Sequence, residues 1–98
     1  MAILPKDTGA VTVDLSAENT FSDGLYTEGA FNLSISGTFS ATITVQRSFD
    51  RGSTWRDVDT FTAPIETFGS DPDPVVVYRA GVKTGDYSSG TATVRIGR

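Results

Sequence analysis

The sequence predicts an all-β fold, a single-domain antiparallel β-sandwich or jelly roll of about seven strands. Two observations lead to this prediction. No stretch shows sustained helical periodicity, whereas apolar and polar residues alternate in several short segments. Clusters of Gly, Asn, Asp and Ser separate these segments and mark turns. A length of 98 residues suits one domain with one core.

The first half of the chain is expected to hold three strands. They cover residues 11–15, 30–36 and 39–46, where every second residue is apolar. Gly37 and Thr38 predict a tight break between the second and third strands. In the polar stretch 16–29, Phe21, Leu25 and Tyr26 form either a short strand or a cover over a sheet edge.

The second half is expected to hold four strands, over residues 54–62, 65–68, 75–82 and 91–96. In the first of these, a bulge near Arg56 or Asp57 would turn both Trp55 and Val58 inward. Pro64 places 65–68 at a sheet edge, and two prolines make 69–74 a surface loop. Strand 75–82 is expected to be central, and 83–90 to be the last turn.

Residues 1–9 are predicted to form a flexible N-terminal arm ahead of a sandwich domain of residues 10–98. This segment contains Pro5 and Gly9 and has no periodicity. It is either a frayed terminus or an arm that docks on a partner through Ile3 and Leu4. It has no apolar core of a signal peptide, so we expect a protein made in the cytoplasm, with no membrane segment.

Composition argues against several function classes. Eight basic residues against twelve acidic ones give a net charge of −4, which disfavours nucleic acid as a partner. The chain has no histidine and no cysteine, so it lacks Ser-His-Asp and Cys-His catalysis and the usual zinc ligands. We therefore expect no enzyme, cofactor or metal site, and a binding or assembly role.

The middle of the chain carries a hairpin motif, Ser48-Phe49-Asp50-Arg51-Gly52-Ser53-Thr54-Trp55. Its hydroxyl and carboxylate groups are suited to bonding the loop backbone, and glycine supplies a positive φ. The spacing resembles the Asp-box, a hairpin motif known as a repeat in sialidases. The matching residues are Ser48, Asp50, Gly52, Thr54 and Trp55. The resemblance implies a structural fastener with its aromatic residue in the core, and no catalytic site.

Two pairs of carboxylates are weak candidates for calcium. Asp57 and Asp59 would share one face of a strand, and Asp50 or a loop carbonyl would complete a site. A solvated strand face that discourages edge pairing is the favoured interpretation. Asp71 and Asp73 lack the spacing and the glycine of a known calcium loop. The tyrosines offer a sugar platform or an interface anchor at Tyr26 and Tyr87, whereas Tyr78 is expected in the core.

The run 78–96, following the hairpin start 46–50, resembles the ending of small virion proteins of tailed bacteriophages, and the likeness covers residues 31–98. It implies a structural virion protein, and our leading hypothesis is a capsid decoration (cement) protein. Such a protein, oligomeric and located in the virion, would bridge major capsid subunits through its loops and its arm. Ile3, Leu4 and Tyr87 are the expected partner contacts. The alternatives are a tail or connector accessory protein, and a carbohydrate-binding module that uses Tyr87 and Tyr26.

Overall fold

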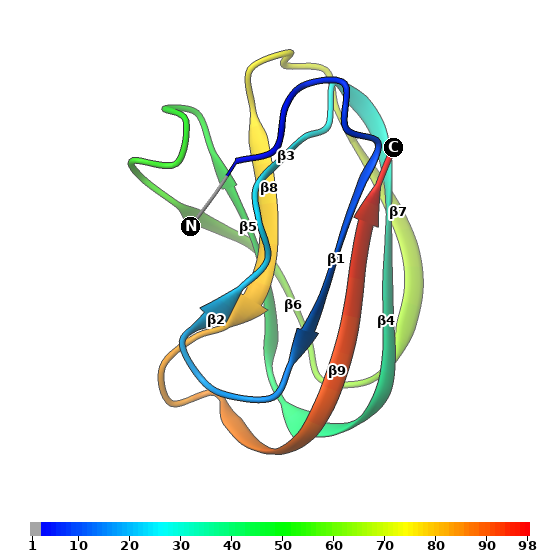
Figure 1. Cartoon of the computed structure of the whole chain (residues 1–98), viewed down its shortest axis with the longest axis vertical. Coiled ribbons are helices and arrows are strands. Elements are labelled where there is room, and N and C mark those ends of the chain that lie inside the picture. The colour runs from blue at the N-terminus through cyan, green and yellow to red at the C-terminus, as the bar shows by residue number, and fades with distance from the viewer. Residues whose placement is uncertain (1–2) are drawn as a thin grey trace.

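The computed structural model describes residues 3–98 and, within that range, consists of nine strands and no helix (Figure 1). The all-β prediction is confirmed, with more strands than expected. The strands are β1 Ala10–Leu15, β2 Thr20–Phe21, β3 Leu25–Tyr26, β4 Gly29–Ala41, β5 Ile43–Ser48, β6 Arg56–Phe61, β7 Ile65–Asp71, β8 Val77–Val82 and β9 Tyr87–Gly97.

The strands form two antiparallel sheets that pack face to face. One sheet has the order β1-β9-β4-β7, and the other has the order β2-β8-β5-β6, with β3 also paired to β8. Apolar side chains from the inner faces of both sheets make one core, which includes Ile35 and Val94 from the first sheet and Ile43 and Val82 from the second. The predicted sandwich is therefore present.

Strand β5 is buried on both of its faces. Ile43 and Val45 point into the core, and the alternate residues Thr44, Gln46 and Ser48 are also buried. Buried polar groups need hydrogen-bond partners, and Gln46 and Ser48 find theirs among neighbouring side chains and the hairpin loop. The sequence pattern predicted one buried face for this segment and missed the covered outer face.

The predicted break at Gly37 and Thr38 is wrong, because β4 runs without interruption from Gly29 to Ala41. The chain changes sheets at Thr42, whose N–H donates to the Asp86 carbonyl at 2.9 Å. Gly37 has a φ of 103°, and a Cβ atom there would collide with the backbone of Thr91 on β9. This glycine marks a close approach of two paired strands instead of a turn.

On β9, Gly90 allows the same close contact with β4. Its φ is 84°, and a Cβ atom there would strike the backbone of Thr38. The expected last turn, 83–90, is accordingly too long, since β9 already begins at Tyr87. The turn itself is closed by the Asp86 N–H, which donates to the Lys83 carbonyl at 3.1 Å.

The return strand of the hairpin contains the expected bulge, one residue later than predicted. Val45 lies opposite Asp59 and Gln46 lies opposite Asp57, which leaves Val58 as the extra residue. The bulge does not turn Val58 inward, because its side chain is 45% exposed. Strand β6 is a sheet edge, and its residues Arg56–Thr60 are all exposed.

Strand β7 lies at the edge of the other sheet, as Pro64 predicted, and is longer than expected. Residues 69–71, assigned to a loop from the sequence, pair with residues 29–31 of β4. The loop begins only at Pro72. The short-strand alternative for the polar stretch 16–29 is also confirmed, since both β2 and β3 pair with β8.

The close approach at Gly37 leads to the first prediction. Gly37→Ala should destabilise the protein more than Gly85→Ala, although both positions have a positive φ, 103° and 90°. A left-handed alanine costs about 1–2 kcal/mol at either position. Only Gly37 adds a collision with a neighbouring strand, because nothing lies within 4 Å of a Cβ atom at Gly85. Urea unfolding of both variants checks this, and equal losses would contradict the close approach.

Candidate partner-binding site

Three segments meet at one end of the sandwich: residues 3–9, the hairpin loop 48–55 and the loop 72–76. We call this region, with Glu28 and Arg98, the hairpin end. Ser48 lies opposite Val77, so the hairpin and the loop 72–76 extend from neighbouring strand ends. The hairpin (green) and the loop 72–76 (yellow) leave the same end of the sheet in Figure 1. The N-terminal segment reaches this end through a bridge between Ile3 and Gly24.

The hairpin loop is tied by its own side chains. The Ser48 hydroxyl accepts the N–H of Gly52 at 2.8 Å and that of Asp50 at 3.3 Å, and donates to Asp50 Oδ1 at 2.7 Å. The same carboxylate oxygen accepts the Thr54 N–H at 2.8 Å. Arg51 and Gly52 adopt φ values of 60° and 90° that turn the chain. Two side chains, those of Ser48 and Asp50, thus make all of these hydrogen bonds.

These hydrogen bonds also act on the ionisation of Asp50. The Ser48 hydroxyl and then the Thr54 N–H hold the pKa of this carboxyl group below its ordinary value of 3.8. Both donors stabilise the charged form, and the carboxylate is exposed enough to remain hydrated. The loop is therefore fastened best when Asp50 is ionised.

Trp55 closes the hairpin motif on the outside of the sheet. It is half-buried and is not a member of the core cluster, so the core position implied by the Asp-box resemblance is wrong. The Arg79 guanidinium carbon lies 4.1 Å from the Trp55 ring centroid and 4.1 Å from that of Phe21. This cation–π stack holds the hairpin against the outer face of β8.

A polar chain continues from that stack across the sheet. Arg79 Nε donates to Gln46 Oε1 at 2.9 Å, and Gln46 Nε2 donates to Asp57 Oδ1 at 2.9 Å. Lys83 Nζ completes the chain with an ion pair to Asp57 Oδ2 at 2.8 Å. Lys83 and then Gln46 lower the pKa of Asp57. These groups cover the polar face of β5.

Asp57 and Asp59, the carboxylates considered for calcium, form hydrogen bonds and an ion pair within the chain. Asp57 binds Gln46 and Lys83, while Asp59 accepts the Thr60 N–H at 2.8 Å. Within residues 3–98, no group of three or more acidic side chains is placed to hold a metal ion.

Asp71 is a buried carboxylate with structural partners. Its Oδ2 accepts the Tyr78 hydroxyl at 2.9 Å and lies 3.7 Å from Arg47 Nη1, and its Oδ1 accepts the Asp73 N–H at 3.2 Å. Burial, followed by the hydrogen bond to Asp71, raises the pKa of Tyr78. Tyr78 is in the core, as predicted, with 3% of its surface exposed. Together these contacts fix the start of the loop 72–76.

The segment 3–9 lies against the domain instead of extending from it as the expected free arm. The Leu4 N–H donates to the Gly24 carbonyl at 2.9 Å, and the Leu4 side chain packs on the core. Ile3 lies beside Gly24 and Gly52, within 3.3 Å of where each would carry a Cβ atom. Ile3 and Leu4, the expected partner contacts, are therefore half-buried within the chain itself. Met1 and Ala2 lie outside the described residues.

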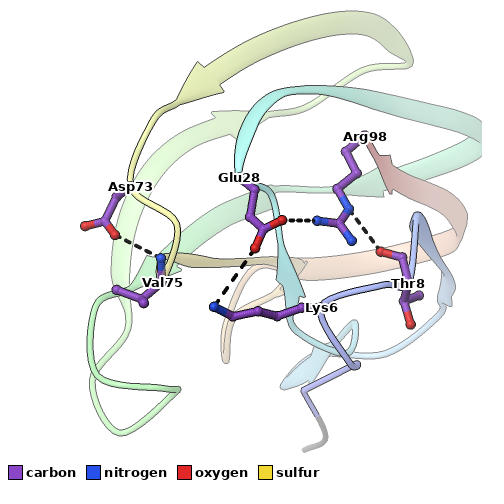
Figure 2. Close-up of polar contacts among 6 residues, drawn as sticks. All are labelled: Lys6, Thr8, Glu28, Asp73, Val75 and Arg98. Carbon is purple, nitrogen blue, oxygen red and sulfur yellow. Dashed lines mark hydrogen bonds and ion pairs between the residues drawn. The ribbon is translucent and has the colours of Figure 1, made fainter.

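An ionic cluster pins this segment to the C-terminus, as Figure 2 shows. Glu28 lies between two cations: its Oε2 is 2.9 Å from Arg98 Nη1, and its Oε1 is 4.0 Å from Lys6 Nζ. Arg98 Nε also donates to the Thr8 carbonyl at 3.1 Å, and the Arg98 N–H donates to the Gly9 carbonyl at 2.9 Å. Both ends of the segment are thus attached to the sandwich.

Two apolar side chains are left exposed on these fixed loops, Phe49 at 52% and Val75 at 46%. Phe49 projects from the hairpin, with the Arg47 guanidinium 5.0 Å from its ring centroid. Val75 lies in a turn, and its own N–H donates to Asp73 Oδ1 at 2.9 Å (Figure 2). Neither residue is predicted as a contact from the sequence. The available signal was an apolar residue inside a stretch rich in turn formers.

The tyrosines do not assemble a sugar platform. Tyr26 lies opposite Val77 at the start of β8, whereas Tyr87 follows the turn after the end of β8 and lies opposite Ala41. The two rings therefore belong to opposite ends of the sandwich. The Tyr87 ring packs against the core, and its hydroxyl donates to the Gly90 carbonyl at 2.8 Å.

The ionisation of Asp50 makes the second prediction. Because its pKa is lowered in the folded state, it stabilises the fold above its unfolded pKa, and this contribution is lost as the pH falls through the folded pKa. Asp50→Asn removes this titration. Its free energy of unfolding should therefore fall less than that of the native chain between about pH 6 and about pH 2.5. Urea titrations at the two pH values measure the difference, and an unchanged pH dependence would contradict the assigned role.

Comparison with known proteins does not assign the chain to a family. No protein-family model matches the chain, and neither a curated protein nor a solved structure matches it. The likeness to the Asp-box and to phage virion proteins stays a prediction. Residues 3–98 contain no helix long and apolar enough to cross a membrane.

Proposed function

We propose that this chain is a non-catalytic assembly protein that binds other protein subunits through its hairpin end. The supporting observation is the exposure of Phe49 and Val75, at 52% and 46%, on two adjacent loops whose backbones are fixed by hydrogen bonds. Aromatic side chains such as Phe are enriched in protein interfaces, and the contacts around such anchors exclude water.

The loops require little ordering on binding. The hairpin is closed by Ser48 and Asp50, and the loop 72–76 is held by Asp71 and Asp73. Binding loses affinity when flexible loops must become ordered, so loops that are already fixed favour a tighter complex. The hairpin end is thus suited to gripping a protein surface.

The charges around the two apolar anchors have mixed signs. Asp50, Arg51 and Arg56 are exposed beside Phe49, and Lys6 and Glu28 lie on the neighbouring segment. A cavity of about 170 Å³ lined by Phe49, Asp50, Thr54 and Arg56 opens at the same place. An apolar centre with a charged rim provides both affinity and orientation toward one partner surface.

The carboxylates of the hairpin end have positioning roles that agree with assembly rather than with catalysis. Asp50 and Asp73 accept backbone N–H groups of their own loops, and Glu28 joins the N-terminal segment to Arg98. An acid–base pair would need two groups with different environments facing a shared space. The carboxylates of the hairpin end instead hold the backbone of its loops in place.

The partner follows from the resemblance to small virion proteins of tailed bacteriophages. We propose a capsid decoration protein that bridges major capsid subunits, with a tail or connector accessory protein as the alternative. The mechanism is binding alone. Each copy that binds two neighbouring subunits stabilises the assembled head by mass action and opposes its dissociation.

Substitution of both anchors makes the third prediction. In phage particles that contain no native copy of this protein, the double variant Phe49→Lys with Val75→Lys should occupy purified heads at least about tenfold less than the native chain does. Two lysines remove the apolar anchors and leave the loop hydrogen bonds intact. Quantitative mass spectrometry of gradient-purified heads and tails measures occupancy.

Thr12→Lys is the matched control, because Thr12 is also exposed but lies on β1, outside the hairpin end. It should decorate heads as the native chain does. Equal occupancy of the double variant and the control would refute the hairpin end as the binding surface. Enrichment of the native chain in tails would move the assignment to a tail accessory protein, and its absence from particles would refute a virion role.

A further inference from the structure

A second surface lies on the side of the sandwich where the edge strands β6 and β7 meet. Among residues 3–98, three of the five exposed large apolar side chains are found there, Val58, Ile65 and Phe68. Phe68 is the most exposed of all, at 85%, and it projects from the outer face of β7. Exposed apolar side chains that lie together on one side of a protein mark an interaction surface.

Strand β7 also lacks the bulge, the several charges and the interruption found at the edges of the other sheet. It pairs with β4 over seven consecutive residues without a register shift, and its outer edge pairs with no described strand. Edge strands usually avoid association by bulges, charges or interruption. The only charged residue of β7 that faces outward is Glu66.

The other three edges are different. Strand β6 has a bulge at Val58 and carries Arg56, Asp57 and Asp59. The edge formed by β2 and β3 is divided into two-residue pieces. Strand β1 has no exposed large apolar side chain. The unprotected edge and the exposed Phe68 ring therefore both belong to β7.

We propose that β7 pairs with β7 of a second copy of this chain, antiparallel and centred on Phe68, to form a two-fold symmetric dimer. In this register all seven residues are paired, and Ile65 lies opposite Asp71 of the partner copy. The sheet β1-β9-β4-β7 then continues directly into its symmetry mate. The two Phe68 rings come together on the outer face and shield each other from water.

The charges favour this register and a second copy as the occupant. Glu66 lies opposite Ser70 of the partner copy, and the two-fold symmetry creates two such pairs of a carboxylate and a hydroxyl group. The same pairing already occurs inside one chain, where the Ser34 hydroxyl donates to Glu66 at 2.6 Å. A register centred on Glu66 would oppose two carboxylates, and one centred on Thr67 would place Glu66 on the Phe68 ring.

The arrangement has a further consequence for the space between the sheets. A two-fold axis perpendicular to the shared sheet keeps both five-stranded sheets on the same side of it. An apolar cavity of about 140 Å³ opens toward this side, lined in part by Phe31, Phe61 and Phe68. The two copies of the cavity then face each other across the dimer axis.

Directed disulfide formation tests the register. The native chain has no cysteine, so each introduced thiol is the only one present. Chains carrying Glu66→Cys mixed with chains carrying Ser70→Cys should form disulfide-linked dimers on mild oxidation, because these positions face each other. Either variant alone should form far fewer. Equal cross-linking of each variant alone, or none in the mixture, would refute the register.

Sedimentation of the purified chain tests the dimer itself, without any capsid present. The native chain should show a concentration-dependent dimer, and Phe68→Lys should raise its dissociation constant at least about tenfold. Thr12→Lys is the matched control, since it adds the same charge to the opposite edge strand of the same sheet. A native chain that remains monomeric up to about 0.5 mM, or a Phe68→Lys variant that dimerises as the control does, would overturn the proposal.

Discussion

The buried hydroxyl group of Ser48 is the interaction on which the hairpin end depends. It sits at the end of β5 with no exposed surface, and it bonds two loop N–H groups and the Asp50 carboxylate at once. Leaving the buried Ser48 hydroxyl group without a hydrogen-bond partner would cost about 1–3 kcal/mol. The loop conformation is therefore determined by a few atoms, and the exposed position of Phe49 follows from it.

The rest of the hairpin end is attached to this loop from different parts of the chain. Ile3 packs beside Gly52, Trp55 stacks on Arg79, and Asp71 joins Tyr78 to the loop 72–76. Each contact links residues that are distant in sequence, so the end is rigid because the two sheets hold its parts together. A binding surface of this kind adds orientation to its apolar contacts at little cost in conformational entropy.

Local features were the ones that the sequence could predict. The Ser48–Thr54 hydrogen bonds lie within seven residues, and alternation identified the inward residues of β9. Features that depend on a distant neighbour were missed. The sequence predicts a break at Gly37, because the closeness of Gly37 to Thr91 depends on how β4 pairs with β9. The Asp-box resemblance implies a core position for Trp55, because it contains no information about Arg79, the stacking partner on another strand. Docking of residues 3–9 likewise depends on the distant residues Gly24 and Arg98.

A hairpin that is ordered before any partner binds should protect its amide groups in the free chain, and amide hydrogen exchange measures this protection. The Gly52 and Thr54 amides donate to Ser48 and Asp50, whereas the Arg51 amide has no such side-chain acceptor in the described loop. We expect slow exchange at Gly52 and Thr54 in the native chain, and loss of protection at Gly52 in Ser48→Ala. Exchange of both amides at the rate of an unstructured peptide in the native chain would contradict this expectation.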